Sequence, residues 1–258
     1  MKQTLLLTAF SVLSGSAFAA TSYNFDSNVV DDLFSGDVAG FTQNVNNPFF
    51  GGEELGLAYI DANPTGGSPA GFLGTTWTNF GTGSVIVTGD ISDAGTLSGQ
   101  QITVDMSLVS SGTVRDSFGI NVTGASSTVA SVFFTPGATS TSWNVSYAVG
   151  GGASESTLVT INTDTSYSFF VQFLDGSITF GYGSGGVSTP FAIALTGAAA
   201  GEDFEGIQFV HTPNPDEAVG FSTNAIVFDN IAVGAIPEPT SAMLMGVAAL
   251  GLLRRRRA

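Results

Sequence analysis

The sequence contains no cysteine, one histidine and only six Lys+Arg residues among 258. Without cysteine, disulfide bonds, zinc ribbons, iron–sulfur clusters and thiol catalysis are excluded. Because 21 Asp+Glu residues give a formal net charge of −15, no patch could neutralise several phosphates, and we expect no nucleic-acid binding. The hydrophobic fraction of 43% and the 21 phenylalanines are in turn incompatible with a disordered acidic tail, which would lack aromatic residues.

The few cations lie almost entirely at the two ends of the chain. Lys2 lies at the N-terminus, Arg115 lies in the body, and the other four are C-terminal. This distribution divides the chain into three segments, which we assign as residues 1–19, 20–235 and 236–258. The middle segment would hold 20 of the 21 acidic residues and Arg115, a formal charge of −19.

The N-terminal segment has the three parts of a secretory signal peptide. Lys2 is followed by an apolar stretch at residues 5–13 and by the small-residue site Ala17-Phe18-Ala19. We expect cleavage after Ala19, with Ala20 as the new N-terminus. The apolar stretch is shorter than the about 20 residues that a membrane span needs. A buried N-terminal helix is the alternative.

The C-terminal segment begins with Pro237, Glu238 and Pro239, which cannot continue a central strand or a regular helix. An apolar run follows at residues 242–253, for which we expect a short hydrophobic helix. It would rise about 18 Å, against about 30 Å for a hydrocarbon core. We therefore expect transient insertion into the inner membrane. The positive-inside rule would keep the terminal cluster cytoplasmic as a membrane stop; this cluster is Arg254, Arg255, Arg256 and Arg257.

Motif, apolar run and arginine cluster together closely resemble the PEP-CTERM sorting signal of Gram-negative bacteria. The resemblance implies that the chain is the substrate of an exosortase, is processed near Pro237, Glu238 and Pro239, and travels through the Sec machinery to the cell envelope, cell surface or extracellular matrix. An ordinary C-terminal tail anchor is the alternative.

The middle segment alternates apolar and polar residues with period two, which is typical of strands with one buried face. Asp175-Gly176 separates two such runs and predicts a hairpin. The clearest predicted strands are 102–108, 118–122, 143–149, 167–174 and 177–182; further strands are expected at 84–88, 128–134, 158–161, 205–210 and 225–233. We predict an all-β domain, a two-sheet antiparallel β-sandwich of the jelly-roll type, with a barrel as the alternative.

Short motifs in this body resemble concanavalin-like or laminin-G-like sandwiches, although a galactose-binding-type jelly roll fits nearly as well. The motifs are Tyr23-Asn24-Phe25-Asp26, Trp143-Asn144-Val145 and Phe228-Asp229-Asn230-Ile231. The resemblance implies that the first and last strands pair, which would bring Asp26 near Asp229. Asp26, Asp229 and Asn230 then offer oxygen ligands for calcium; the alternative is that these are ordinary turn residues.

The remaining chemistry of the body is sparse, and we assign no catalytic residue. Glycoside hydrolysis needs two carboxyl groups across a sugar bond, but Glu202-Asp203-Phe204-Glu205 lacks the Glu-x-Asp-x-Glu spacing of concanavalin-like enzymes. His211 precedes a Pro-rich stretch and is interpreted as a loop histidine without a role. Among the aromatic residues that could contact sugar, Trp77 is the best candidate, ahead of Tyr59 and Tyr182. Trp143 is expected in the core.

These observations predict an exported envelope or matrix protein with a structural or adhesive role in a polysaccharide or biofilm layer. The expected partners are the exosortase, the export machinery and extracellular polysaccharide. A carbohydrate-binding module is the alternative, and a glycoside hydrolase a distant one; we expect no enzymatic activity.

Overall fold

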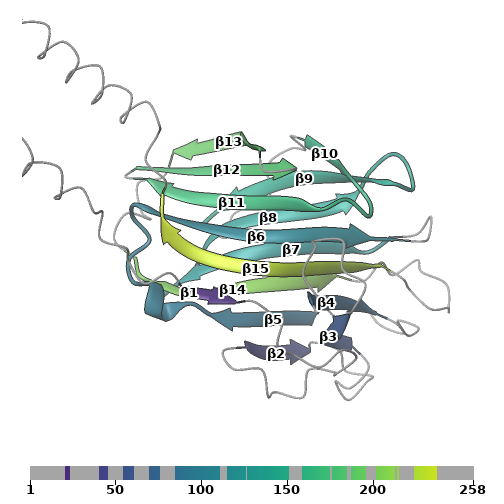
Figure 1. Cartoon of the computed structure of the whole chain (residues 1–258), viewed down its shortest axis with the longest axis horizontal. Coiled ribbons are helices and arrows are strands. Elements are labelled where there is room, and N and C mark those ends of the chain that lie inside the picture. The colour runs from purple at the N-terminus through teal and green to yellow at the C-terminus, as the bar shows by residue number, and fades with distance from the viewer. Residues whose placement is uncertain are drawn as a thin grey trace, which may run out of the picture.

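The computed structural model of the chain (Figure 1) describes residues 21–23, 41–45, 55–60, 70–75, 85–110, 115–125, 127–150, 159–174, 176–184, 187–195, 202–212, 214 and 224–236. The proposed signal peptide, Asp26, Trp77 and residues 237–258 lie outside this part. The described residues form fifteen strands and one short 3₁₀ helix, η1 (Ser92–Ala94). They include no helix long and apolar enough to span a bilayer.

All the strands pair antiparallel in two sheets. Sheet A has the order β13-β12-β11-β6-β15-β4-β3, with β1 also pairing with β15; sheet B has the order β10-β9-β8-β7-β14-β5-β2. The strands of sheet A are β1 (Thr21–Tyr23), β3 (Leu55–Ile60), β4 (Ala70–Thr75), β6 (Gln100–Val109), β11 (Tyr167–Leu174), β12 (Ser177–Ser184), β13 (Val187–Leu195) and β15 (Ala225–Ala235). The strands of sheet B are β2 (Phe41–Val45), β5 (Val85–Asp90), β7 (Ser117–Gly124), β8 (Thr128–Pro136), β9 (Ser142–Val149), β10 (Val159–Asn162) and β14 (Phe204–Thr212). The predicted all-β, two-sheet antiparallel sandwich is confirmed.

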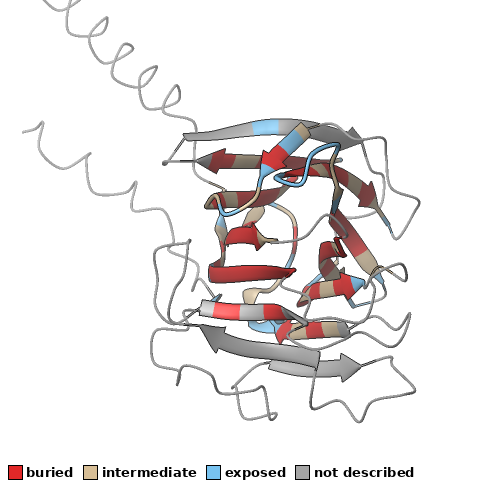
Figure 2. Cartoon of the chain, turned by 90° about the vertical axis from the view of Figure 1, so that its right-hand side faces the viewer, coloured by how far each residue is buried: buried red, intermediate tan, exposed pale blue. Residues whose placement is uncertain are grey.

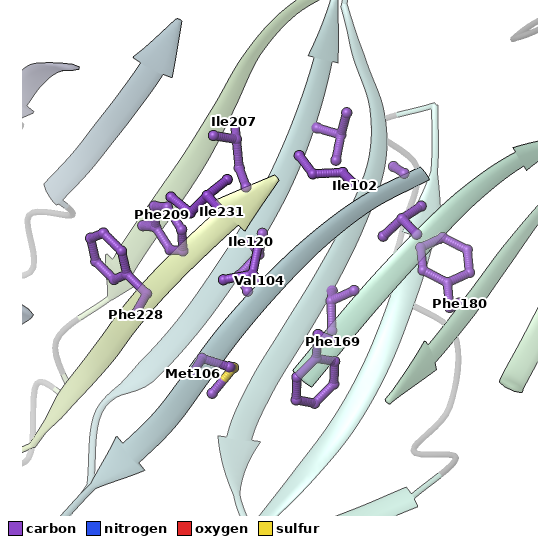
Figure 3. Packing of buried hydrophobic residues seen from close by; sticks show 14 of the residues in the cluster. Ile102, Val104, Met106, Ile120, Phe169, Phe180, Ile207, Phe209, Phe228 and Ile231 are labelled. Atoms are coloured by element: carbon purple, nitrogen blue, oxygen red, sulfur yellow. The ribbon is translucent and has the colours of Figure 1, made fainter. Parts of the chain in front are cut away.

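The core lies between the two sheets, where the buried faces of the alternating strands meet (Figures 2 and 3). Phe209 of β14 stacks on Phe228 of β15 with ring centroids 3.8 Å apart, which joins sheet B to sheet A. Phe134 of β8 meets Phe169 of β11 edge to face at 5.2 Å. Trp143 is fully buried, so its predicted place in the core is confirmed. Fully burying such a side chain contributes about 1.5–3 kcal/mol relative to leaving it exposed.

The first and last strands pair, as the resemblance implied: Thr21 lies opposite Val233, and Tyr23 lies opposite Ile231. The Ile236 amide then donates a hydrogen bond to the Gly99 carbonyl at 3.1 Å. Both ends of the described domain therefore emerge at one end of the sandwich, on the left in Figure 1. We call this the terminal end.

The opposite end of the sandwich is reached along β15. That strand has 11 residues, which at about 3.4 Å each span about 35 Å. At this end β7, β9, β11 and β15 begin, while β6, β8 and β14 finish. We call it the far end.

Candidate functional sites at the two ends of the sandwich

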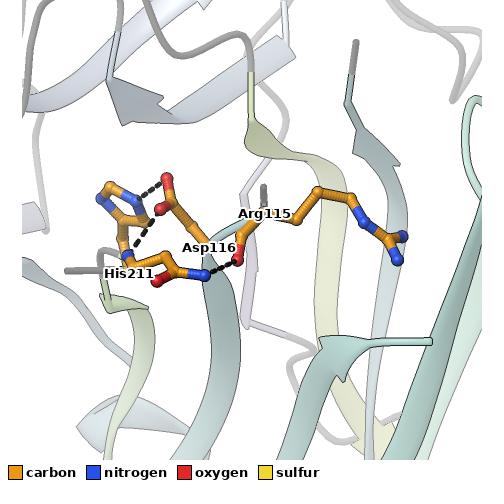
Figure 4. A network of polar contacts seen from close by, with 4 residues as sticks. Arg115, Asp116 and His211 are labelled. Atoms are coloured by element: carbon orange, nitrogen blue, oxygen red, sulfur yellow. Dashed lines mark hydrogen bonds and ion pairs between the residues drawn. The ribbon is translucent and has the colours of Figure 1, made fainter. Parts of the chain in front are cut away.

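A buried contact between a histidine and an aspartate lies at the far end. His211, near the end of β14, approaches Asp116, immediately before β7, with Nε2 and Oδ2 2.8 Å apart; both side chains are fully buried. The second carboxylate oxygen of Asp116 accepts a hydrogen bond from the Asn214 amide at 2.8 Å. The Asn214 side chain donates to the Arg115 carbonyl at 3.3 Å (Figure 4). The network thus ties the end of β14 to the start of β7.

The interpretation of His211 as a loop residue is wrong. His211 lies in β14 opposite Phe118, and its ring stacks on that phenylalanine with centroids 5.1 Å apart. Ile207, Phe209 and His211 are all buried and recur with period two, so His211 continues the core face of the strand. This alternation in the sequence could have shown that His211 belongs to the strand. The two prolines that follow His211 made it look like a loop residue.

Aromatic packing connects this pair to Arg115. Phe118 also meets Trp143 edge on at 5.8 Å, and the Arg115 guanidinium carbon lies 4.9 Å from the Trp143 ring centroid. His211 Nδ1 and Trp143 Nε1 are buried and have no hydrogen-bond partner within the described part of the chain. Because both side chains are fully buried, the described contacts of the His211–Asp116 pair hold strands together.

Arg115 binds backbone rather than presenting its charge to solvent. The side chain is 3% exposed and its guanidinium, which points away from His211 in Figure 4, donates to three carbonyls of the β8–β9 turn. These belong to Gly137 (3.0 Å), Thr139 (2.7 Å) and Ser142. Burial lowers the pKa of Arg115 below its ordinary value. Since Arg115 is the only Lys or Arg between residues 20 and 235, the surface of this segment presents no Lys or Arg charge.

The residues proposed for calcium lie on the outer side of sheet A. Asp229 lies opposite Asp105 of β6 and directly precedes a bulge in β15, which contains Asn230. Asn230 has a left-handed φ of 48°; its amide donates to Asp229 Oδ1 at 2.7 Å and its side chain to Asp105 Oδ2 at 3.2 Å. Sequence reasoning missed Asp105. Within the described residues no group of three or more His, Asp and Glu side chains could hold a metal, and Asp26 lies outside them.

The acidic run at the start of β14, residues 202–205, lies at the terminal end. Asp203 and Glu205 are exposed, while Glu202 is half-buried. Their backbone joins the run to η1 and the turn after it: Leu97 donates to the Glu202 carbonyl at 2.9 Å and Phe204 to the Gly95 carbonyl at 2.8 Å. The described contacts of this run are therefore structural.

Of the predicted sugar-contacting residues Trp77, Tyr59 and Tyr182, the structure describes only the side chain of Tyr182. Tyr182 is half-buried and packs against the core, with its ring 5.7 Å from that of Phe169 and 5.8 Å from that of Tyr167. The Tyr59 side chain and the whole of Trp77 lie outside the described residues.

Residues 235–257 match the PEP-CTERM protein-sorting motif. The comparison with curated proteins gives no match. Solved structures share the sandwich at low identity, which shows the fold alone. An alginate lyase, Aly36B, is 16% identical, with a TM-score of 0.52, and the match covers 84% of this chain and 98% of the lyase. A structure titled for endo-acting O-glycanases of human gut microbiota is 13% identical, with a TM-score of 0.51 and coverage of 84% and 99%. The CBM2 module of the evolved Dit of Lactobacillus casei BL23 phage J-1 is 15% identical, with a TM-score of 0.50 and coverage of 85% and 99%.

The motif indicates an exported protein that an exosortase sorts. Its match begins at Ala235, the last residue of β15, so it directly follows the folded sandwich. The chain thus combines a jelly-roll β-sandwich with a C-terminal PEP-CTERM protein-sorting motif.

Proposed function

We propose that this chain is a non-catalytic protein of the bacterial cell surface or extracellular matrix, delivered there by processing at Pro237, Glu238 and Pro239. The observation that carries the proposal is the sorting motif at residues 235–257, placed directly behind the last strand. In this proposal Ala17, Ala19 and Ala20 form the signal-cleavage site, and the arginines after residue 253 hold the tail at the cytoplasmic face.

The fold supports processing at both ends of the chain. β15 is a central strand between β6 and β4, and the hydrogen bond of Ile236 to Gly99 is the last described contact before Pro237. A cut within the motif would remove no strand of the sandwich. Because β1 pairs with the end of β15, both cuts would occur at the terminal end, and the far end would face away from the membrane during sorting.

The charge of the body supports a structural or adhesive role. With Arg115 buried, a mature segment of formal charge −19 repels its own copies, which favours a dispersed, hydrated matrix component. Divalent cations could bridge such copies, and Asp229, Asn230 and Asp26 remain the proposed calcium ligands. A carbohydrate-binding module is the second candidate, favoured by the sandwich fold shared with a CBM2 module. Trp77 remains its proposed aromatic contact.

Cell fractionation with mass spectrometry of the mature C-terminus tests the proposal. The Pro237→Ala/Glu238→Ala/Pro239→Ala variant should accumulate unprocessed in the membrane fraction, while the native protein appears outside the cell without its arginine cluster. The Pro213→Ala/Pro215→Ala variant is the matched control, because it changes the other Pro-x-Pro sequence of the chain. Released native protein that still carries Arg254, Arg255, Arg256 and Arg257 would contradict the proposal.

A further inference from the structure

The outer side of sheet B carries an uncharged surface at its centre. Six half-buried residues from four neighbouring strands define this neutral face: Thr88, Asn121, Thr123, Phe133, Gln208 and Val210. Each alternates with core residues of its strand and so points away from the core. The charged residues at its described margin are Asp90 and Glu205, toward the terminal end. We propose that the neutral face binds an uncharged polysaccharide chain.

Phe133 and Val210 provide an apolar patch on this face. Both flank Gly119 of β7, which lies between them in the sheet register. A Cβ atom built on Gly119 would lie 3.6 Å from Phe133 Cδ1 and 3.7 Å from Val210 Cβ. Because Gly119 has no side chain and is buried, Phe133 and Val210 lie close to each other over it and form one apolar patch. The C–H side of a sugar ring is apolar and can cover such a patch.

A pair of amide side chains lies beside the apolar patch. Asn121 Nδ2 donates to Gln208 Oε1 at 3.3 Å across β7 and β14. This bond uses one donor and one acceptor, so the Asn121 carbonyl oxygen and the Gln208 amino group can still meet a ligand. Thr88 of β5 lies opposite Gln208, and Thr123 of β7 lies opposite Gly206, whose carbonyl accepts a hydrogen bond from the Thr123 hydroxyl at 3.1 Å. The face thus combines an amide pair and two threonines with an aromatic ring.

The negative charge of the body favours a neutral polysaccharide over an anionic one on this face. The predicted mature segment has a formal charge of −19 and presents no exposed Lys or Arg, so its field repels polyanions. A neutral chain meets no such repulsion and needs only hydrogen bonds and an apolar surface, which this face supplies. The proposal names the ligand class for the carbohydrate-binding candidate above and does not depend on sorting.

Affinity electrophoresis of the purified full chain tests this binding. Native gels would contain dextran, galactomannan or hydroxyethyl cellulose as neutral polysaccharides and alginate as the anionic one. We expect retardation by at least one neutral polymer that persists from about 0.05 to 0.5 M NaCl, because no ion pair is screened. Phe133→Ala should weaken this binding at least about tenfold. Gln208→Glu, which keeps the side-chain shape, should weaken it as well.

The opposite sheet supplies a matched control. Gln172 Nε2 donates to Gln101 Oε1 at 2.8 Å on the outer side of sheet A. Gln101→Ala/Gln172→Ala should bind as the native chain does, whereas Asn121→Ala/Gln208→Ala should not. Thermal unfolding of every variant separates loss of binding from loss of folding. No retardation by any neutral polymer, retardation by alginate alone, or a dimer that Phe133→Ala dissociates would each overturn the proposal. None of these results would bear on sorting.

Discussion

At the scale of single residues, the sole cation of the body has a structural task. Arg115 reaches from the start of β7 and binds three carbonyls of the β8–β9 turn. Lysine could not reproduce this arrangement, because guanidinium presents several donors in a fixed planar fork. From the sequence alone, Arg115 would be the one residue of the body that could bind an anion. In the structure its guanidinium binds backbone carbonyls of the same chain instead.

Replacing Arg115 should therefore destabilise the protein. Arg115→Met keeps an unbranched apolar side chain but removes the guanidinium from Trp143 and leaves the turn carbonyls without their donor, and we expect a loss of about 3 kcal/mol in the free energy of unfolding. Urea unfolding of the full chain measures this loss. Asn144→Ala is the control, because it removes only one 3.3 Å bond to Pro136 of the same turn and should cost about 0.5–1 kcal/mol. Equal costs for the two variants would contradict this role.

Asp90, at the end of β5, allows a pH test. Hydrogen bonds from the Ser92 hydroxyl (2.6 Å) and the Ser92 amide (2.9 Å) lower the pKa of this carboxyl below its ordinary value of 3.8. A lowered folded-state pKa stabilises the protein above the unfolded pKa, and this stabilisation is lost as the pH falls through the folded value. The effect is small, because Asp90 is exposed.

Ser92→Ala should raise the pKa of Asp90 toward its ordinary value, since it removes the larger of the two causes. NMR titration of the Asp90 carboxyl carbon measures this change directly. The difference in stability between the native chain and Ser92→Ala should shrink below about pH 4. A pKa of Asp90 that does not move in the variant would show that the backbone amide alone holds the carboxylate.

At the scale of elements, the β11–β12 hairpin shows what local sequence determines. Leu174 pairs with Ser177 across the two-residue turn, and Gly176 has a φ of 75°, which other residues adopt only with strain. Gly176→Ala should cost about 1 kcal/mol of stability, measured by urea unfolding. Gly119→Ala, where φ is ordinary and the new Cβ meets only van der Waals contacts, should change stability by less than about 0.5 kcal/mol. A larger loss of stability in Gly119→Ala than in Gly176→Ala would show that the positive φ of Gly176 is not the reason for glycine in this turn.

Alternation and turn chemistry are local, so the predicted strands from 84 onward correspond to β5 through β12, β14 and β15. β2, β3, β4 and β13 were not predicted. β3 and β4 carry glycines, and β13 has Pro190 in mid-strand, features that normally argue against strands.

The sheet orders could not be predicted, because β14 joins β5 and β15 joins β4 across more than 100 residues. The polar site at the far end depends on those long-range pairings, which is why the His211–Asp116 pair was not foreseen.

At the scale of the whole molecule, the two proposed processing sites lie at one end of the sandwich and the buried polar contacts at the other. Signal cleavage and sorting both concern the terminal end, where β1 and the end of β15 pair. The His211–Asp116 pair and the Arg115-bound turn lie about 35 Å away, at the far end. The anionic body can therefore keep its fold and its exposed faces whether or not the tail is present.

The position of the last strand makes this independence testable by truncation. A chain that stops after Ile236 keeps β15 and the hydrogen bond to Gly99, so its melting temperature should lie within about 2 °C of that of the full chain. A chain that stops after Asn230 loses the pairing of Ala232–Ala235 with Thr103–Gln100 and all three described partners of β1. It also loses the buried Ile231 and Val233, whose removal costs several kcal/mol, so it should fail to fold. Thermal unfolding followed by circular dichroism distinguishes the two. If the chain ending at Ile236 were as unstable as the shorter one, the tail would be part of the folded domain and its removal during sorting would unfold the protein.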